Sequence, residues 1–265
     1  MKHLIIKSKK KVFGSLLGRN LSTFKGNGID FREVREYNYG EDAKKIDWKI
    51  SAKFQKPFVK EFDEERELNI IVCILANGSL HFGSKRLKSE LIAEIVALLG
   101  LSAVKFDNKF SLIIFEKKPI IHTKPTKTQK GVISIVENIY NFNFLKKEFS
   151  FEFVNYLNKF KKSILFLIGD FYSYPNLILK HETYIVWVRD RFEENPNPLG
   201  EIDLIDPVTL KEVHTNLNKS SLKRYTENIT KRDKKFIEYL KKEKIKFTKI
   251  YTDDEPFYKL AELLK

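Results

Sequence analysis

NIIVCILANGSLHFGS, residues 69–84, begins as a continuous apolar run and ends in small and polar residues. A short apolar run rich in β-branched side chains is typical of a strand that is covered on both faces of a sheet. The run stops at Asn77, Gly78 and Ser79, which together form a turn signal. The stretch therefore predicts a buried strand over residues 69–75, followed at its carboxyl end by polar side chains.

Apolar strands and amphipathic helices alternate along the chain after residue 68. The patterns predict further strands at residues 110–115, 163–169, 183–190 and 245–252, and helices at 88–104, 130–142, 151–162, 221–244 and 256–265. The helix at 221–244 would bury a seam formed by Tyr225, Ile229, Phe236 and Leu240. This alternation predicts an α/β fold with a doubly wound, mostly parallel sheet and helices on both faces.

Ligands bind such sheets at the carboxyl ends of the strands. That rule directs attention to Asn77 and Ser79 after the first strand, and to Asp170 after the strand at 163–169. We therefore expect these side chains to share one edge of the sheet.

The composition indicates a protein with a sizeable core and no membrane span. The 265 residues are 42% hydrophobic, but no apolar run reaches the roughly 20 residues that a spanning helix needs. The first 15 residues lack the apolar stretch of a signal peptide. Cys73 is the only cysteine, so no intrachain disulfide can form and a reducing compartment is expected. We expect the protein to be cytoplasmic, with peripheral contact at the inner face of the membrane as the alternative.

The net charge is +14, and 40 of the 49 basic residues are Lys. Proteins that read nucleic-acid sequence favour Arg, because its guanidinium makes bidentate contacts with bases. We therefore interpret most of the Lys excess as compositional and do not expect nucleic acid as a partner. A basic module that binds nucleic acid or an anionic membrane surface is the alternative.

Residues 26–67, GNGIDFREVREYNYGEDAKKIDWKISAKFQKPFVKEFDEERE, mix charged and aromatic side chains with glycines. One interpretation is a cap held by ion pairs, with Phe31, Tyr37 and Trp48 as its apolar anchors. The other is a recognition surface, because Arg, Tyr and Trp dominate binding hot spots. We predict an N-terminal cap at residues 1–67 and an α/β domain at 68–265.

The spacing of this segment resembles the signature of the bacterial domain-of-unknown-function family fifty-eight. The matching residues are Gly26, Gly28, Phe31, Arg35, Tyr37, Gly40, Asp42, Ile46, Asp47, Trp48, Ser51, Ala52 and Lys53. A later stretch at 189–209 is similar to a second family segment, through Asp190, Glu193 or Glu194, Gly200 and Asp206. The resemblance implies a von Willebrand factor A-like domain with a β-rich N-terminal cap. It also implies a partner, a MoxR-type AAA+ ATPase, with membrane-anchored von Willebrand A proteins as a further class.

Metal-ion-dependent adhesion sites of von Willebrand A-like domains use D-x-S-x-S after the first strand, a distant Thr and a second Asp. In this chain the ungapped alignment places Leu75, Asn77 and Ser79 at the first motif, and Asp170 at the second Asp. Thr126 and Thr128 are the candidates for the Thr. Mg²⁺ requires several oxygen ligands, and Leu75 supplies none. We therefore expect a degenerate ion site and no cofactor, with weak Mg²⁺ binding as the alternative.

No nucleophile, phosphate-binding loop or zinc motif accompanies these residues. The sequence therefore predicts a non-enzymatic protein-interaction module. Through the resemblance, we expect an accessory or adaptor of a MoxR-type ATPase that serves maturation, stress or envelope functions.

Overall fold

A computed structural model of the chain describes residues 25–26, 30–63, 68–197 and 200–265. The predictions for Gly28, and for the side chain of Phe31, lie outside the described part. The chain divides into two compact units, one at residues 18–67 and one that contains residues 68–265. Below, they are called the N-terminal unit and the α/β unit.

The N-terminal unit contains an antiparallel sheet in the order β1-β3-β2. Its strands are β1 (Lys25–Gly26), β2 (Asp30–Glu36) and β3 (Phe58–Asp63). Between β2 and β3 the chain forms a 3-10 turn, η2 (Ala43–Lys45), and the short helix α2 (Trp48–Phe54). A β-rich N-terminal segment was expected, and the helix α2 is an addition to it.

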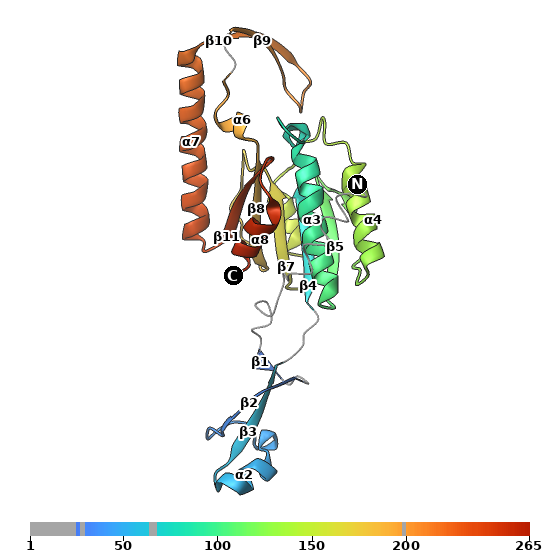
Figure 1. Cartoon of the computed structure of the whole chain (residues 1–265), viewed down its shortest axis with the longest axis vertical. Coiled ribbons are helices and arrows are strands. Elements are labelled where there is room, and N and C mark those ends of the chain that lie inside the picture. The colour runs from blue at the N-terminus through green and yellow to red at the C-terminus, as the bar shows by residue number, and fades with distance from the viewer. Residues whose placement is uncertain (1–24, 27–29, 64–67, 198–199) are drawn as a thin grey trace. The chain divides into compact units, whose positions relative to one another are not determined.

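The α/β unit contains a six-stranded sheet in the order β11-β8-β7-β4-β5-β6 (Figure 1). Its strands are β4 (Asn69–Leu75), β5 (Lys109–Phe115), β6 (Pro119–His122), β7 (Ile164–Gly169), β8 (Glu182–Arg189) and β11 (Lys246–Tyr251). All neighbours pair in parallel except β6, which runs antiparallel to β5 at one edge. The predicted α/β fold with a mostly parallel central sheet is confirmed.

Helices cover both faces of this sheet. Figure 1 shows α3 (Lys88–Lys105), α4 (Gln129–Tyr140) and α8 (Pro256–Leu263) in front of the strands. α3 packs between α4 and α8, which explains why Leu91 and the residues after it through Val104 are all buried. On the opposite face, α5 (Phe153–Leu157) and α7 (Lys219–Lys242) pack against Cys73, Leu167 and Trp187.

The elements that the sequence patterns missed include the edge strand β6 and a hairpin of β9 (Gly200–Ile205) and β10 (Glu212–Leu217). The hairpin follows the one-turn helix α6 (Arg191–Glu194) and precedes α7. Most of its side chains are exposed or half-buried, so it lacks the continuous apolar run that revealed the core strands.

The predicted seam of α7 needs one correction. Ile229, Phe236 and Leu240 are buried, but the side chain of Tyr225 is 42% exposed. Asp233 is buried on the same stripe, where the pattern would place an apolar residue. A buried carboxylate requires ion-pair or hydrogen-bond partners, and this one has three cationic partners, described below.

Candidate functional site

The carboxyl ends of β4, β7 and β8 lie side by side, because the three strands are parallel neighbours. Each is followed at once by polar residues, with Asn77 after β4, Asp170 after β7 and Asp190 after β8. A 3-10 turn, η3 (Gly78–His81), begins directly beyond Asn77. As the sequence predicts, polar residues therefore follow the carboxyl ends of neighbouring strands at one end of the sheet.

Ser79 and Asp170 meet at this edge, and a lysine joins them. The Ser79 hydroxyl donates a hydrogen bond to Oδ2 of Asp170. Nζ of Lys88, at the start of α3, lies 3.6 Å from the same oxygen and 2.6 Å from Oε1 of Glu193 in α6. The side chains of Lys88 and Asp170 are 0% and 1% exposed. A buried ammonium group thus stands beside Asp170, where a bound cation would have to lie.

The donor set does not fit a divalent metal ion. Leu75 belongs to the apolar core. The side chain of Asn77 caps η3 by accepting a hydrogen bond from the Ser79 amide at 2.9 Å, so its amide oxygen already has a partner. Within the described ranges, no group of three or more His, Cys, Asp and Glu side chains is placed to hold a metal ion. A divalent ion would also have to displace the Lys88 ammonium.

Thr126 and Thr128 lie at the amino ends of the strands, whereas the predicted ion site lies at their carboxyl ends. Their proposed place in the ion site is therefore wrong. Thr126 forms an antiparallel bridge with Phe110 at the amino end of β5, and Thr128 caps α4. Because β6 runs antiparallel, the chain has returned to the amino ends before α4 begins. The loop after α4 reaches the site instead, where the Lys147 carbonyl accepts a hydrogen bond from the Gly78 amide at 2.8 Å.

A second buried ion cluster lies next to the first. Asp233 of α7 pairs with Nη2 of Arg189 at 3.2 Å and with Nζ of Lys249 at 2.9 Å. Lys249 also pairs with Glu194, and Arg232 lies 3.3 Å from Asp233. These contacts supply the partners that the buried Asp233 requires.

Tyr172 connects the two clusters. Its ring centroid lies 4.4 Å from Cζ of Arg189 and 5.7 Å from Nζ of Lys88. Burial raises the pKa of Tyr172, and the negative charge of Glu193 raises it further. The phenol therefore stays neutral, and the cations of both clusters are engaged within the fold.

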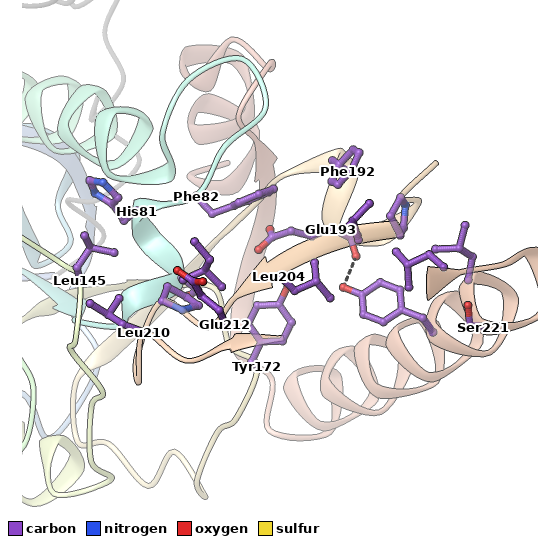
Figure 2. A pocket seen from close by; sticks show the side chains of 18 residues that line it. His81, Phe82, Leu145, Tyr172, Phe192, Glu193, Leu204, Leu210, Glu212 and Ser221 are labelled. Atoms are coloured by element: carbon purple, nitrogen blue, oxygen red, sulfur yellow. Dashed lines mark hydrogen bonds between the residues drawn. The ribbon is translucent and has the colours of Figure 1, made fainter. Parts of the chain in front are cut away.

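An apolar groove of about 920 Å³ opens beside Ser79 (Figure 2). Its walls come from η3, α6, the β9–β10 hairpin and the first turns of α7. Apolar side chains dominate the lining, including Phe82, Phe192, Ile202, Leu204, Leu210 and Leu222. Lys and Arg are absent from the described lining, although the chain carries 49 of them. The groove is therefore an apolar, cation-free surface on a basic protein.

The hairpin is held over the strand ends by its turn. Asp206 organises the turn by accepting hydrogen bonds from the Val208 amide at 2.9 Å and the Thr209 hydroxyl at 2.6 Å. The Pro207 carbonyl accepts a hydrogen bond from the Lys146 amide and packs on Gly78, where a Cβ would come within 2.4 Å of its oxygen. A glycine at position 78 is thus required for the hairpin turn to pack against η3.

Comparison with known proteins assigns the chain to a family. The family described as "Protein of unknown function DUF58" matches residues 33–235. The chain belongs to the DUF58 family. The predicted family membership is confirmed, and both parts of the sequence that carried the resemblance lie largely within the match.

Among curated relatives, the DUF58 chain is 33% identical over 76 residues to "Uncharacterized protein Rv1480" from Mycobacterium tuberculosis H37Rv and to "Uncharacterized protein Mb1516" from Mycobacterium bovis. The match covers 29% of this chain and 24% of each relative, so the chain spans about a quarter of the length of the curated relatives it matches.

Two solved structures resemble the DUF58 chain at 11% identity. BatB from Bacteroides thetaiotaomicron gives a TM-score of 0.44 over 74% of this chain and 97% of that one. An aerotolerance-related membrane protein from Bacteroides fragilis gives 0.43 over 74% and 96%. In this DUF58 chain, none of the described helices is long and apolar enough to cross a membrane.

Most signature residues of this DUF58 chain build the local structure of the N-terminal unit. Arg35 pairs with Glu41 at 3.0 Å, and the Tyr37 hydroxyl donates to the Glu41 carbonyl at 2.6 Å. Gly40 adopts a φ of +102°, which favours glycine. Asp42 caps η2 by accepting a hydrogen bond from the Lys44 amide.

Asp47 and Ser51 fix α2. Asp47 caps the helix by accepting hydrogen bonds from the Lys49 and Ile50 amides, both at 3.0 Å, and it pairs with Lys60. The buried Ser51 hydroxyl donates to the Asp47 carbonyl and accepts from the Phe58 amide, both at 2.8 Å. Trp48 is 70% exposed, so it does not anchor the core of the N-terminal unit itself, and its predicted role as an anchor of the cap on the sheet stays a prediction. Together with Lys53, it faces solvent.

Sequence reasoning missed Lys88, which pairs with both Asp170 and Glu193. Lys88 carried a usable signal, because a cation in the first turn of a helix opposes the helix dipole and needs a separate reason. The groove carried a weaker one, since Ile202 and Leu204 alternate with acidic residues before the turn signal at Asp206. Neither signal reveals which segments the fold brings together.

Proposed function

We propose that this DUF58 protein is a non-enzymatic interaction module that serves as an accessory of a MoxR-type AAA+ ATPase. In this proposal the groove beside Ser79 binds a segment of the ATPase through direct contacts, and no shared metal ion bridges the two proteins. The observation that carries the proposal is the buried Lys88 ammonium, 2.6 Å from Glu193 and 3.6 Å from Asp170, next to an apolar groove.

Two features of the α/β unit support a von Willebrand factor A-like assignment within this proposal. The sheet is parallel apart from one antiparallel edge strand, β6. Ser79 and Asp170 also occupy the strand ends where a metal-mediated contact of that fold would form. The cation position is satisfied internally, which favours a contact surface that works by apolar burial. Membrane-anchored von Willebrand A proteins are the second class of partner under this proposal.

The groove assignment predicts a selective loss of ATPase binding. Leu204 lines the groove and is 47% exposed, so Leu204→Glu should fold normally but place a charge where the partner would bury apolar surface. We expect its affinity for the purified MoxR-type ATPase to fall by at least about tenfold, measured in solution in the presence of Mg²⁺ and ATP.

Ile178→Glu is the matched control, because Ile178 is 77% exposed and does not line the groove. It should bind the ATPase as the unmodified protein does. If the unmodified protein does not bind the ATPase, the accessory role is wrong. If both variants bind equally well, the role can stand but the groove is not the contact surface.

The internal cation predicts that the site takes up no Mg²⁺. Calorimetric titration of the protein with Mg²⁺ should show no binding tighter than about 1 mM, because the ion would have to shed water and displace Lys88. Micromolar binding that Asp170→Ala abolishes would contradict this prediction and would restore a metal-bridged contact as the mechanism.

A further inference from the structure

The exposed face of α2 combines an aromatic side chain with lysines. Trp48, Lys49, Ala52 and Lys53 are all exposed, whereas Ser51 is buried. At 100° per residue, these four exposed positions span about 140° of the helix circumference, so they form one continuous face. Phe54, which is 65% exposed, ends the helix.

The lysines on and beside this face are not neutralised within the fold. Among the described residues, Lys44, Lys45, Lys49 and Lys53 make no ion pair, and all four are exposed. The neighbouring carboxylates are engaged elsewhere, since Asp47 pairs with Lys60 and Glu36 pairs with Lys56. The face of α2 therefore presents net positive charge, although the unit as a whole contains many acidic residues.

The face is also held rigidly. The capping hydrogen bonds of Asp47 fix the start of α2, and the two hydrogen bonds of Ser51 tie the helix to β3. The exposed Trp48 side chain is thus available to a partner outside the unit. We call Lys44, Lys45, Trp48, Lys49 and Lys53 the α2 surface.

We propose that the α2 surface docks the protein on an anionic lipid bilayer. Trp is enriched at membrane interfaces, where its ring lies at the level of the headgroups, and surrounding lysines attract anionic lipids. Interfacial helices combine these residue types, with aromatic side chains that enter the lipid and lysines that remain among the headgroups. The lipid surface is thus the partner whose chemistry matches this face.

Two features disfavour other occupants. None of the five residues of the α2 surface is Arg, the residue that reads bases by bidentate contacts, so nucleic acid fits poorly. Four residues of the surface are Lys, a residue type that is depleted at protein–protein interfaces, so a protein partner fits less well. The inference concerns a different compact unit from the groove and does not depend on the ATPase.

Tryptophan fluorescence offers a direct test, because the chain has only two Trp residues. Trp187 is fully buried and donates a hydrogen bond to the Asp170 carbonyl at 2.7 Å, so its emission should not respond to lipid. Adding vesicles of phosphatidylcholine with about one-third phosphatidylglycerol should shift the emission to the blue and allow quenching by brominated acyl chains. Pure phosphatidylcholine vesicles should produce neither effect, and salt should weaken binding to the anionic vesicles.

Substitutions on the α2 surface test whether this surface is the part of the protein that contacts the vesicles. Combining Lys49→Gln with Lys53→Gln should lower the vesicle partition coefficient by more than tenfold, at about fivefold per lysine. Combining Lys231→Gln with Lys235→Gln is the matched control, since it removes the same charge from the exposed face of α7 and should change partitioning far less. Trp48→Phe should abolish the spectral shift while sedimentation still detects bound protein.

The outcomes are distinct. No binding to the anionic vesicles at low salt overturns the proposal, as does an equal loss in the two lysine pairs. A duplex DNA that binds through Lys49 and Lys53, with no vesicle binding, would identify nucleic acid instead. Loss of ATPase binding in Trp48→Ala, again without vesicle binding, would make the α2 surface a protein contact.

Discussion

The contact with Lys88 changes the interpretation of Asp170 from a metal ligand to a partner in a buried ion pair. A carboxylate at the end of a parallel strand, with a serine hydroxyl on it, resembles the remnant of a metal site when the sequence alone is considered. The ammonium group within 3.6 Å supplies the missing positive charge from the protein itself. Breaking a buried ion pair by removing one partner costs about 3–5 kcal/mol, so this arrangement is expected to be fixed and not to exchange with solvent ions.

Asp190 shows how one carboxylate can hold three segments at a strand end. It is fully buried and accepts hydrogen bonds from the Ser84 amide at 2.9 Å, the Phe192 amide at 2.9 Å and the Thr252 hydroxyl. Burial acts to raise the pKa of Asp190, but the hydrogen bonds from Thr252 and Ser84 outweigh it and hold the pKa below its usual value.

A lowered pKa for Asp190 gives its contribution to stability a definite pH dependence. The unfolded chain binds the proton more readily, so the contribution is present above the unfolded pKa of about 3.9 and is lost as pH falls through the folded value. Asp190→Asn should lower the free energy of unfolding by about 1.5–3 kcal/mol at pH 7, measured by urea denaturation. The difference from the unmodified protein should shrink below about pH 4.

Asp203→Asn is a suitable control for Asp190, because the Asp203 side chain is 72% exposed. Its effect on the unfolding free energy should stay within about 0.5 kcal/mol. A loss for Asp190→Asn that is the same at both pH values would show that the hydrogen-bond geometry matters and the charge does not.

At the scale of elements, the β9–β10 hairpin is what turns a strand-end site into a groove. Its strands pair with each other and with no other described strand, so its position depends on the contacts of its ends and its turn. The turn packs on Gly78 and Lys146, and the groove lies beneath. The same dependence makes the hairpin the element that a single substitution can displace.

Gly78→Ala should displace the hairpin. The added Cβ would lie 2.4 Å from the Pro207 oxygen, so the turn must move, at a cost of about 1–3 kcal/mol. We expect faster amide hydrogen exchange across residues 200–217, with the six-stranded sheet unaffected. Gly169→Ala is the control, because its Cβ would meet Leu75 at an ordinary 3.4 Å. Unchanged exchange in the hairpin of Gly78→Ala would mean that its turn does not depend on this contact.

α7 shows the limit of periodicity at the same scale. The pattern correctly predicts that Ile229, Phe236 and Leu240 are buried. It wrongly includes Tyr225 among the buried residues and does not predict the burial of Asp233. A polar residue on an apolar stripe can be recognised as buried only when its partners are known, and Arg189 and Lys249 are distant in sequence.

At the scale of the whole molecule, the net charge of +14 is distributed unevenly. The groove of the α/β unit has no described Lys or Arg in its lining, whereas the α2 surface of the N-terminal unit has four unpaired lysines. Composition alone cannot distinguish a general Lys excess from such a division, because both give the same sum. The two surfaces are therefore proposed to serve different partners, a protein segment and a lipid bilayer.

The sequence by itself determined the family, the α/β class and most of the elements of the core. Strands β4, β7 and β8, and helices α3 and α4, carry patterns that depend only on local periodicity and burial. The residues at the ends of β4 and β7 could be named for the same reason, since the direction of parallel strands follows from the alternation with helices.

Only the tertiary structure decided what those residues do. It placed the Lys88 ammonium against Asp170, and it placed Thr126 and Thr128 at the amino ends of the strands, away from the predicted ion site. It also left Trp48 exposed on the N-terminal unit. Each outcome depends on which distant segments meet, and on the cost of burying a charge without a partner. Periodicity reports which face of an element is buried, but the identity of the group on the other side is set by the folding of the whole chain.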